Sequence, residues 1–281
     1  MAEEDVTRSP LEEEHALLGA SLDQAGRATS YATVDDELAA FTEGCALCDV
    51  WGAYSLLMEG EKAEAFVDAT CAGTPLDAGD AALEAVLSGD GSVIGVPIVA
   101  RMGASEFVLW DMTPRAEALD AWLSFVQGIE QKGVAPYADV NCEDVTGGLA
   151  PLLLWGPAAT RVLGDYLGAG VEPPEPGHVS TPKLDGRIAS VIVRTAAVPD
   201  ALLVCVPHEV ARVLWRSLMS FMEVTPVGTE ALRAHACQQL PWAASLVADD
   251  RVDLAKDVLV SAGLVRTTGG FIGQRGLDSA R

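Results

Sequence analysis

Positive charge is scarce in this sequence. Lysine and arginine number 18 against 41 aspartates and glutamates, which gives a formal net charge of −23 at pH 7. A surface of this sign repels nucleic-acid phosphates and anionic lipid headgroups, so we expect no nucleic acid and no membrane as partners. The same charge would suit a basic protein partner, and it would also fit a proteome in which acidic surfaces are general.

Long hydrophobic runs and a secretory signal are also missing. No apolar run approaches the ~18–20 residues that a membrane-spanning helix needs. The N-terminus, MAEEDVTRSPLEEEH, is acidic and has no apolar signal core, so we expect a cytoplasmic protein. The six cysteines are scattered through 281 residues, which predicts reduced thiols rather than a disulfide framework.

Motifs that identify a metal site or a common catalytic class are lacking. The four histidines show no ligand spacing with one another, and no metal site is expected. No Ser–His–Asp signature, P-loop or GxGxxG is present. Cys45-Ala-Leu-Cys48 has the spacing of a thiol redox motif. We favour two small apolar core residues as its explanation, with thiol redox as the alternative.

The sequence does contain a clear β-hairpin pattern. Residues 91–114, GSVIGVPIVARMGASEFVLWDMTP, place the apolar runs Val93–Val99 and Phe107–Trp110 on either side of a turn near Gly103. The first run has no polar side chain. It is either an ordinary core strand or a position from which a catalytic acid has been lost.

Helical patterns accompany the strands. Thr113-Pro114 predicts the start of a helix, with Thr113 as its N-cap. Further along, RIASVIVR and ALLVCVP predict two paired strands. Strands and helices mix without a strict βαβ alternation, so the sequence predicts the α+β class.

Two charged residues stand out against apolar surroundings. Arg233 lies in ALRAHACQQLPW. One interpretation is an exposed or salt-bridged guanidinium. The other is an anion receptor that binds a carboxylate through two hydrogen bonds. Asp111 ends a strand pattern just before the predicted helix. It either helps to cap that helix or places a carboxylate at the mouth of a cleft, and the residues alone leave both alternatives open.

Seven segments follow one another in the order of a known family. They are LEEEHALLGASL, DVWGAYSLLMEGEKAEAFVDATCAG, GSVIGVPIV, FVLWDMTPRAEALDAWL, LLLWGPAATRVL, GTEALRAHACQQL and GGFIGQRGL. Together they resemble the folate-binding aminomethyltransferases, the family of the T-protein of the glycine cleavage system. The collinear set, rather than any single motif, carries the resemblance.

The resemblance implies a fold of two related α+β modules around a central channel. We expect residues 1–50 and 140–255 to form a discontinuous folate-binding-like module, and residues 51–139 to form the second. Residues 256–281 are expected to be a C-terminal tail. The family's C-terminal barrel-like domain is expected to be absent, either lost or supplied by a separate polypeptide.

The resemblance also assigns site residues. The family's catalytic aspartate corresponds to Gly95, and its pterin-binding glutamate corresponds to Leu203, so two acids are replaced here. Asp111 matches a pterin-contacting asparagine and is the candidate catalytic and cofactor-binding carboxylate. Arg233 matches a basic position on the folate side and is the candidate for holding the glutamate tail.

Tetrahydrofolate is the cofactor that the resemblance implies, with Trp110 and Tyr54 as candidate flanks of the pterin ring. Aromatic residues on strands are otherwise core residues. The implied function is a tetrahydrofolate-dependent aminomethyl- or methyltransferase, diverged from glycine cleavage, acting on folate and a small methylated amine. The alternative is a non-catalytic folate-binding or scaffold subunit of a larger methyltransferase assembly. Its partner would be a basic protein or a subunit that supplies the missing third domain.

Overall fold

The computed structural model describes residues 8–130, 132–168, 170–248 and 251–279, and within them the strands form two main sheets. The first sheet is antiparallel throughout. Its order is β10 (Asn141–Asp144), β4 (Tyr54–Glu59), β9 (Glu106–Asp111), β8 (Ile98–Gly103) and β5 (Ala81–Leu83). The second sheet has the order β12 (His178–Ser180), β15 (Val191–Arg194), β16 (Ala201–Pro207), β11 (Leu149–Trp155), β3 (Cys45–Asp49) and β17 (Val224–Pro226). Its strands are antiparallel up to β3, and β17 is parallel to β3.

Three short ladders accompany the two sheets. They are β1 (Ser21–Leu22) with β2 (Ala28–Ser30), β6 (Val86–Leu87) with β7 (Val93–Gly95), and β13 (Lys183–Leu184) with β14 (Ile188–Ala189).

The predicted hairpin and the predicted strand pair are both present. Strands β8 and β9 pair through the turn after Gly103, and β15 pairs with β16. The run Val93–Val99 is not one strand, however. It divides into β7 and β8 around Pro97, because proline has no N–H to donate to a ladder. The first half then pairs with β6 instead of continuing in the main sheet.

Helices cover the outer face of each sheet. On the six-stranded sheet lie α1 (Glu12–Leu17), α5 (Ala159–Leu167) and α6 (Ala211–Leu218), the last preceded by the 3₁₀ turn His208–Val210. On the five-stranded sheet lie α3 (Ala63–Thr70) and α4 (Ala116–Gln127). Successive side chains of a strand point alternately into an outer core beneath the helices and into an inner core between the sheets. Leu152 and Leu154 face the helices, whereas Leu153 and Trp155 face inward.

The predicted start of α4 is wrong by two residues. The helix begins at Ala116 behind Arg115, whose side chain makes no capping bond. The N–H of Thr113 donates to Asp111 Oδ1 at 2.7 Å, so the chain first makes a turn, and the hydroxyl of Thr113 accepts from the N–H of Arg115 at 3.3 Å. Asp111 therefore holds the turn that leads from β9 to α4.

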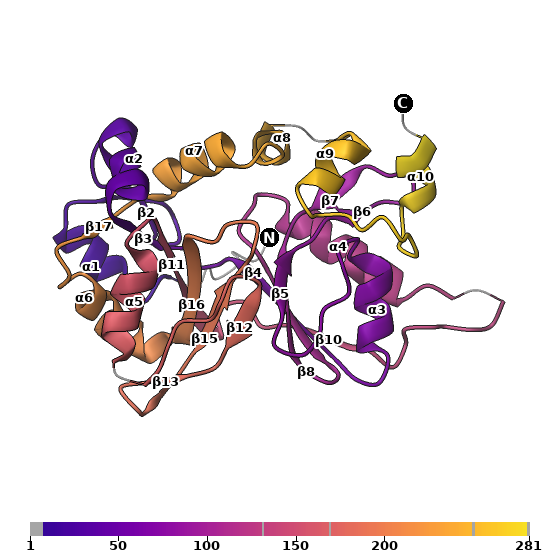
Figure 1. Ribbon diagram of the computed structural model, residues 1–281, viewed down its shortest axis with the longest axis horizontal. Coiled ribbons are helices and arrows are strands. Elements are labelled where there is room, and N and C mark those ends of the chain that lie inside the picture. The colour runs from indigo at the N-terminus through magenta and orange to yellow at the C-terminus, as the bar shows by residue number, and fades with distance from the viewer. Residues whose placement is uncertain (1–7, 131, 169, 249–250, 280–281) are drawn as a thin grey trace, which may run out of the picture.

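A third core lies between the two sheets. It joins the inner faces of both sheets to helices α2 (Val34–Glu43), α7 (Thr229–Gln239), α8 (Ala243–Ala248), α9 (Lys256–Ser261) and α10 (Gln274–Ser279). Figure 1 shows α7, α8 and α9 running in sequence across the top of the molecule, from one sheet to the other. The inner core therefore belongs to both halves of the chain.

The two sheets meet edge to edge at β5 and β12. The N–H of Ala81 donates to Gly177 O and the N–H of Val179 donates to Gly79 O, each at 2.8 Å. His178 Nε2 also lies 3.6 Å from Asp80 Oδ1. These bonds make the sheets two walls of one structure, as Figure 1 shows near its centre.

The C-terminal segment packs on the five-stranded module. The N–H of Arg266 donates to Ala72 O at 2.7 Å, and the N–H of Ile272 donates to Ala69 O at 2.8 Å. The predicted division at residues 51, 140 and 256 remains a proposal, and residues 1–7 and 280–281 fall outside the described ranges. Across the described part of the chain, no helix combines the length and apolarity needed to cross a membrane.

Candidate functional site

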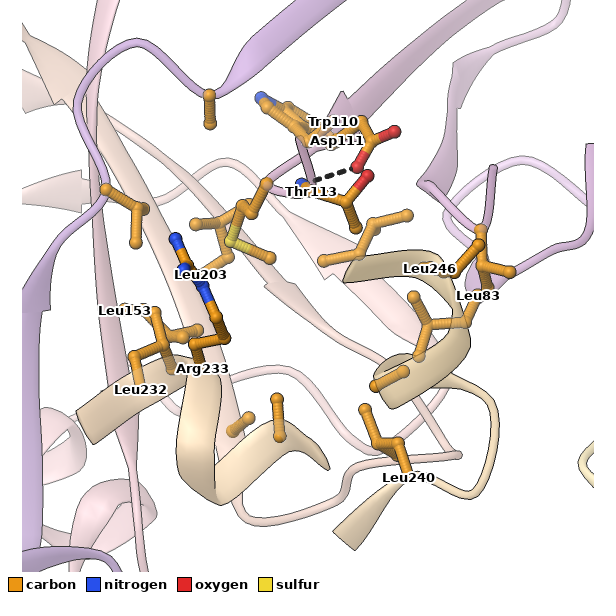
Figure 2. Close-up of a pocket in the computed structure, with 18 of the residues that line it drawn as sticks. Leu83, Trp110, Asp111, Thr113, Leu153, Leu203, Leu232, Arg233, Leu240 and Leu246 are labelled. Atoms are coloured by element: carbon orange, nitrogen blue, oxygen red, sulfur yellow. Dashed lines mark hydrogen bonds between the residues drawn. The ribbon is translucent and has the colours of Figure 1, made fainter. Parts of the chain in front are cut away.

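A pocket of about 360 Å³ lies between the inner faces of the two sheets. Strands of both sheets form its walls, and α7 and α8 form a further side. Its surface is mostly apolar, and Figure 2 shows leucines all around it: Leu83, Leu153, Leu203, Leu232, Leu240 and Leu246. A mainly hydrophobic cavity of this size with a few polar groups is typical of small-molecule sites.

Asp111 is the acidic residue of this pocket lining. It ends β9 and is 2% exposed. Its Oδ1 accepts from the N–H of Thr113, a bond that Figure 2 marks with a dashed line. Its Oδ2 is buried and has no hydrogen-bond partner among the described residues. Burial raises the pKa of Asp111, against the opposing effect of its hydrogen bonds from Thr113 and the charge of Arg115.

Gly95 lies directly beside the unpaired oxygen of Asp111. A Cβ at this glycine would stand 3.3 Å from Asp111 Oδ2 and 3.6 Å from Leu119 Cδ2. Side chains alternate between the two faces of a strand. Asp111 therefore lies on the same face of β9 as Phe107 and Leu109, which is the face toward α4. Its carboxyl group therefore lies at the boundary between the pocket and the core beneath α4.

Two arginines also line the pocket, from elements far apart in the sequence. Arg233 is exposed on α7, and Figure 2 shows its side chain extending from the helix along the pocket. Arg27 lies in the turn before β2 and is half-buried. The sequence singled out Arg233 but not Arg27, because nothing local in LDQAGRATS indicates a pocket.

The structure brings most of the sequence-predicted site residues together. Trp110 and Leu203 line the same pocket as Asp111 and Arg233. Tyr54 is not among the lining residues. It packs in the core beneath α3 and α4, and its hydroxyl donates to Asp120 Oδ1 on α4 at 2.6 Å.

The cysteine pair lies away from this pocket. Cys45 and Cys48 are both buried on β3, and burial raises the pKa of both thiols, that of Cys45 to about 12. A thiol redox centre needs an accessible thiolate, so the described geometry favours core residues. The half-buried Cys237, by contrast, lines the pocket from α7. Among the described residues, no three His, Cys, Asp or Glu side chains gather into a possible metal site.

Two α+β modules enclose an apolar pocket with a buried carboxyl and two arginines, a combination that is typical of small-molecule sites. Among solved structures, the fold matches glycine cleavage system aminomethyltransferase T from Bartonella henselae with a TM-score of 0.75 and 20% identity. That match covers 97% of this chain and 74% of the other. Heterotetrameric sarcosine oxidase from Corynebacterium sp. U-96 matches at a TM-score of 0.43 and 20% identity, over 75% and 92% of the two chains.

The sequence places the chain in a family. The model of the GCVT N-terminal domain matches residues 11–238, and the chain belongs to this family. An aminomethyltransferase from Chlorobaculum parvum (strain DSM 263 / NCIMB 8327) is 29% identical over 209 residues. The match covers 72% of this chain and 55% of that protein, so the chain spans about half the length of this curated relative. The predicted aminomethyltransferase-like family and the α+β class are confirmed.

Proposed function

We propose that the pocket binds a reduced folate and that the chain is a tetrahydrofolate-dependent one-carbon transferase, with an aminomethyl or methyl group as its cargo. The observation that carries this proposal is the combination of Asp111 and Arg233 in one apolar pocket. A folate has a flat heterocycle with N–H donors at one end and carboxylates at the other. A buried acceptor and an exposed guanidinium match these two ends.

The residues present fit such a ligand. Each carboxylate oxygen of Asp111 has two lone pairs, so the group has acceptor capacity beyond its bond from Thr113. Oδ2 is an orphaned buried atom of the kind that a ligand donor satisfies. Trp110 and Leu203 supply apolar surface for the ring, and Arg233 supplies the cation for the anionic end. When bound, the folate supplies the nitrogen atoms that carry the one-carbon group.

The chemistry of this chain itself is then positioning and electrostatics. The apolar walls surround the ligand, and Asp111 holds it at its N–H edge or stabilises positive charge on a small methylated amine. Gly95 stands where the resemblance places an acid, and a Cβ at this position would lie 3.3 Å from Asp111 Oδ2. Asp111 therefore places a carboxyl group next to the position at which the family's acid is missing.

Calorimetric titration with tetrahydrofolate and 5-methyltetrahydrofolate under anaerobic conditions tests the proposal. We expect micromolar binding to the wild type and weaker binding to Asp111→Asn and Arg233→Ala. Arg161→Ala serves as the matched control, because it removes one exposed arginine on α5 that pairs with Asp165 and Glu223 away from the pocket. Absence of binding up to millimolar ligand, or equal binding by Asp111→Asn, would refute the assignment.

A second candidate is a non-catalytic folate-binding or scaffold subunit. Leu203 favours it, because this inner-face position matches an acid of the family and here has no polar group. In that case the −23 charge would face a basic partner, or a subunit that supplies a third domain. Folate binding without turnover of any methylated amine, together with a defined heteromeric complex in solution, would favour this candidate.

A further inference from the structure

The turn between β1 and β2 is built to hold one arginine in place. Asp23 Oδ1 accepts from the N–H groups of Ala25 and Arg27 at 2.9 and 3.0 Å, and Gly26 supplies the left-handed conformation, with φ of 74°. The second oxygen of Asp23 accepts from Arg27 Nε at 2.7 Å and lies 2.7 Å from Nη2. One carboxylate thus fixes both the loop and the guanidinium.

The guanidinium of Arg27 bridges this turn to the pocket rim. Its Nη1 donates to Trp51 O at 3.0 Å, immediately before Gly52, which also lines the pocket. A Cβ at Gly52 would lie 4.0 Å from the same Nη1. Asp23 and Trp51 use three of the five N–H donors of Arg27, and no hydrogen bond within the described residues uses the other two.

An arginine held in this way loses little entropy when it binds an anion. Its side chain remains 35% exposed, so a ligand in the pocket can reach the free donors. Arg233 lies on the same pocket but belongs to α7. The charge of Arg27 is paired with that of Asp23, but the two arginines from separate elements still offer N–H donors for an anion at one apolar pocket.

We propose that Arg27 is a second anion-binding residue and makes the pocket specific for ligands that carry two carboxylates at one end. Arg233 takes one carboxylate and Arg27 takes the other. This inference rests on the proposed folate function, and it adds a specificity-determining residue for the outer end of that ligand. Planar guanidinium groups suit this role because each can bind a carboxylate through two parallel hydrogen bonds.

The test compares two ligands that differ by one carboxylate. Tetrahydrofolate carries two, and its analogue with γ-aminobutyrate in place of glutamate keeps the pterin and carries one. Both are titrated calorimetrically against the wild type, Arg27→Ala, Arg27→Lys and the control Arg161→Ala. We expect the wild type to prefer tetrahydrofolate by about tenfold, the ratio that one charge-assisted hydrogen bond supplies.

Arg27→Ala should remove this preference while its affinity for the one-carboxylate analogue stays near that of the wild type. Arg27→Lys should keep part of the preference, and Arg161→Ala should keep all of it. If Arg27→Ala weakens both ligands equally, the arginine is only structural and the inference fails. It also fails, with the folate proposal intact, if the wild type binds both ligands equally. If neither ligand binds the wild type, the folate proposal fails as well.

Discussion

Glu84 provides a sharp test of the packing between the pocket wall and the C-terminal segment. It lies between β5 and β6, is 2% exposed, and its Oε2 accepts from the N–H of Gly73 at 3.1 Å. Burial raises the pKa of Glu84 from 4.5 to about 7, although the Gly73 hydrogen bond and the charge of Arg266 act in the opposite direction. A buried glutamate with this pKa destabilises the folded chain when it is ionised.

The magnitude follows from linkage between protonation and folding. The folded chain holds this proton more tightly than the unfolded chain, so the contribution of Glu84 to stability is greatest below pH 4.5 and is lost as the pH passes about 7. At 1.36 kcal/mol for each pKa unit, the interval from 4.5 to about 7 corresponds to about 3 kcal/mol. Roughly 2 kcal/mol of this is lost between pH 5.5 and 8.5.

Glu84→Gln isolates this contribution. Glutamine keeps the volume and an acceptor for the N–H of Gly73 but cannot ionise. Urea unfolding gives the free energy of unfolding of the variant and of the wild type at each pH. The difference in favour of the variant should be larger by roughly 2 kcal/mol at pH 8.5 than at pH 5.5. Glu106→Gln, at an exposed position on β9, controls for the loss of one charge. A difference that stays constant between the two pH values would refute the reasoning.

Three further predictions concern the pocket and the cores. Cys237 should react with N-ethylmaleimide faster than the buried cysteines, and tetrahydrofolate at ten times its Kd should slow that reaction roughly tenfold, measured by peptide mass spectrometry. Gly73→Ala should cost about 1–3 kcal/mol in urea unfolding, because its Cβ would stand 2.5 Å from Glu84 Cδ, whereas Gly89→Ala, with no atom within 4 Å, should stay within about 0.5 kcal/mol. Leu109→Ala, at a fully buried strand position, should cost about 2–5 kcal/mol in the same assay, and a smaller loss would mean that the core collapses around the cavity.

The local pattern of apolar and polar residues was enough to predict the fold class and several helices and strands. The hairpin of β8 and β9 and the pairing of β15 with β16 follow from apolar runs that short connections join. The start of α4 did not follow, because Thr113 has good capping chemistry in isolation but Asp111 bonds to its N–H first. The hydroxyl of Thr113 does accept from the N–H of Arg115, but the helix begins only at Ala116, and the sequence pattern alone does not place that boundary.

The site was predictable only where the resemblance supplied the positions. Asp111, Trp110, Leu203 and Arg233 line one pocket, although 122 positions separate Asp111 from Arg233 in the sequence numbering. Tyr54 was assigned to the ring flank, but its strand position turns it toward Asp120 on α4. Arg27 was missed because its role depends on contacts between the turn and Trp51, which no periodicity encodes.

The strand order also has a consequence for the time course of synthesis. The five-stranded sheet is complete once Asp144 has left the ribosome, whereas β3 lacks its parallel neighbour β17 until Pro226 has emerged. At usual elongation rates of about 5–20 residues per second, these 82 residues take roughly 4–16 s. During that interval the apolar edge of β3, CALCD, has no partner on that side. Nascent chains of this protein are therefore expected to bind chaperones through residues 45–49 until the last strand is made.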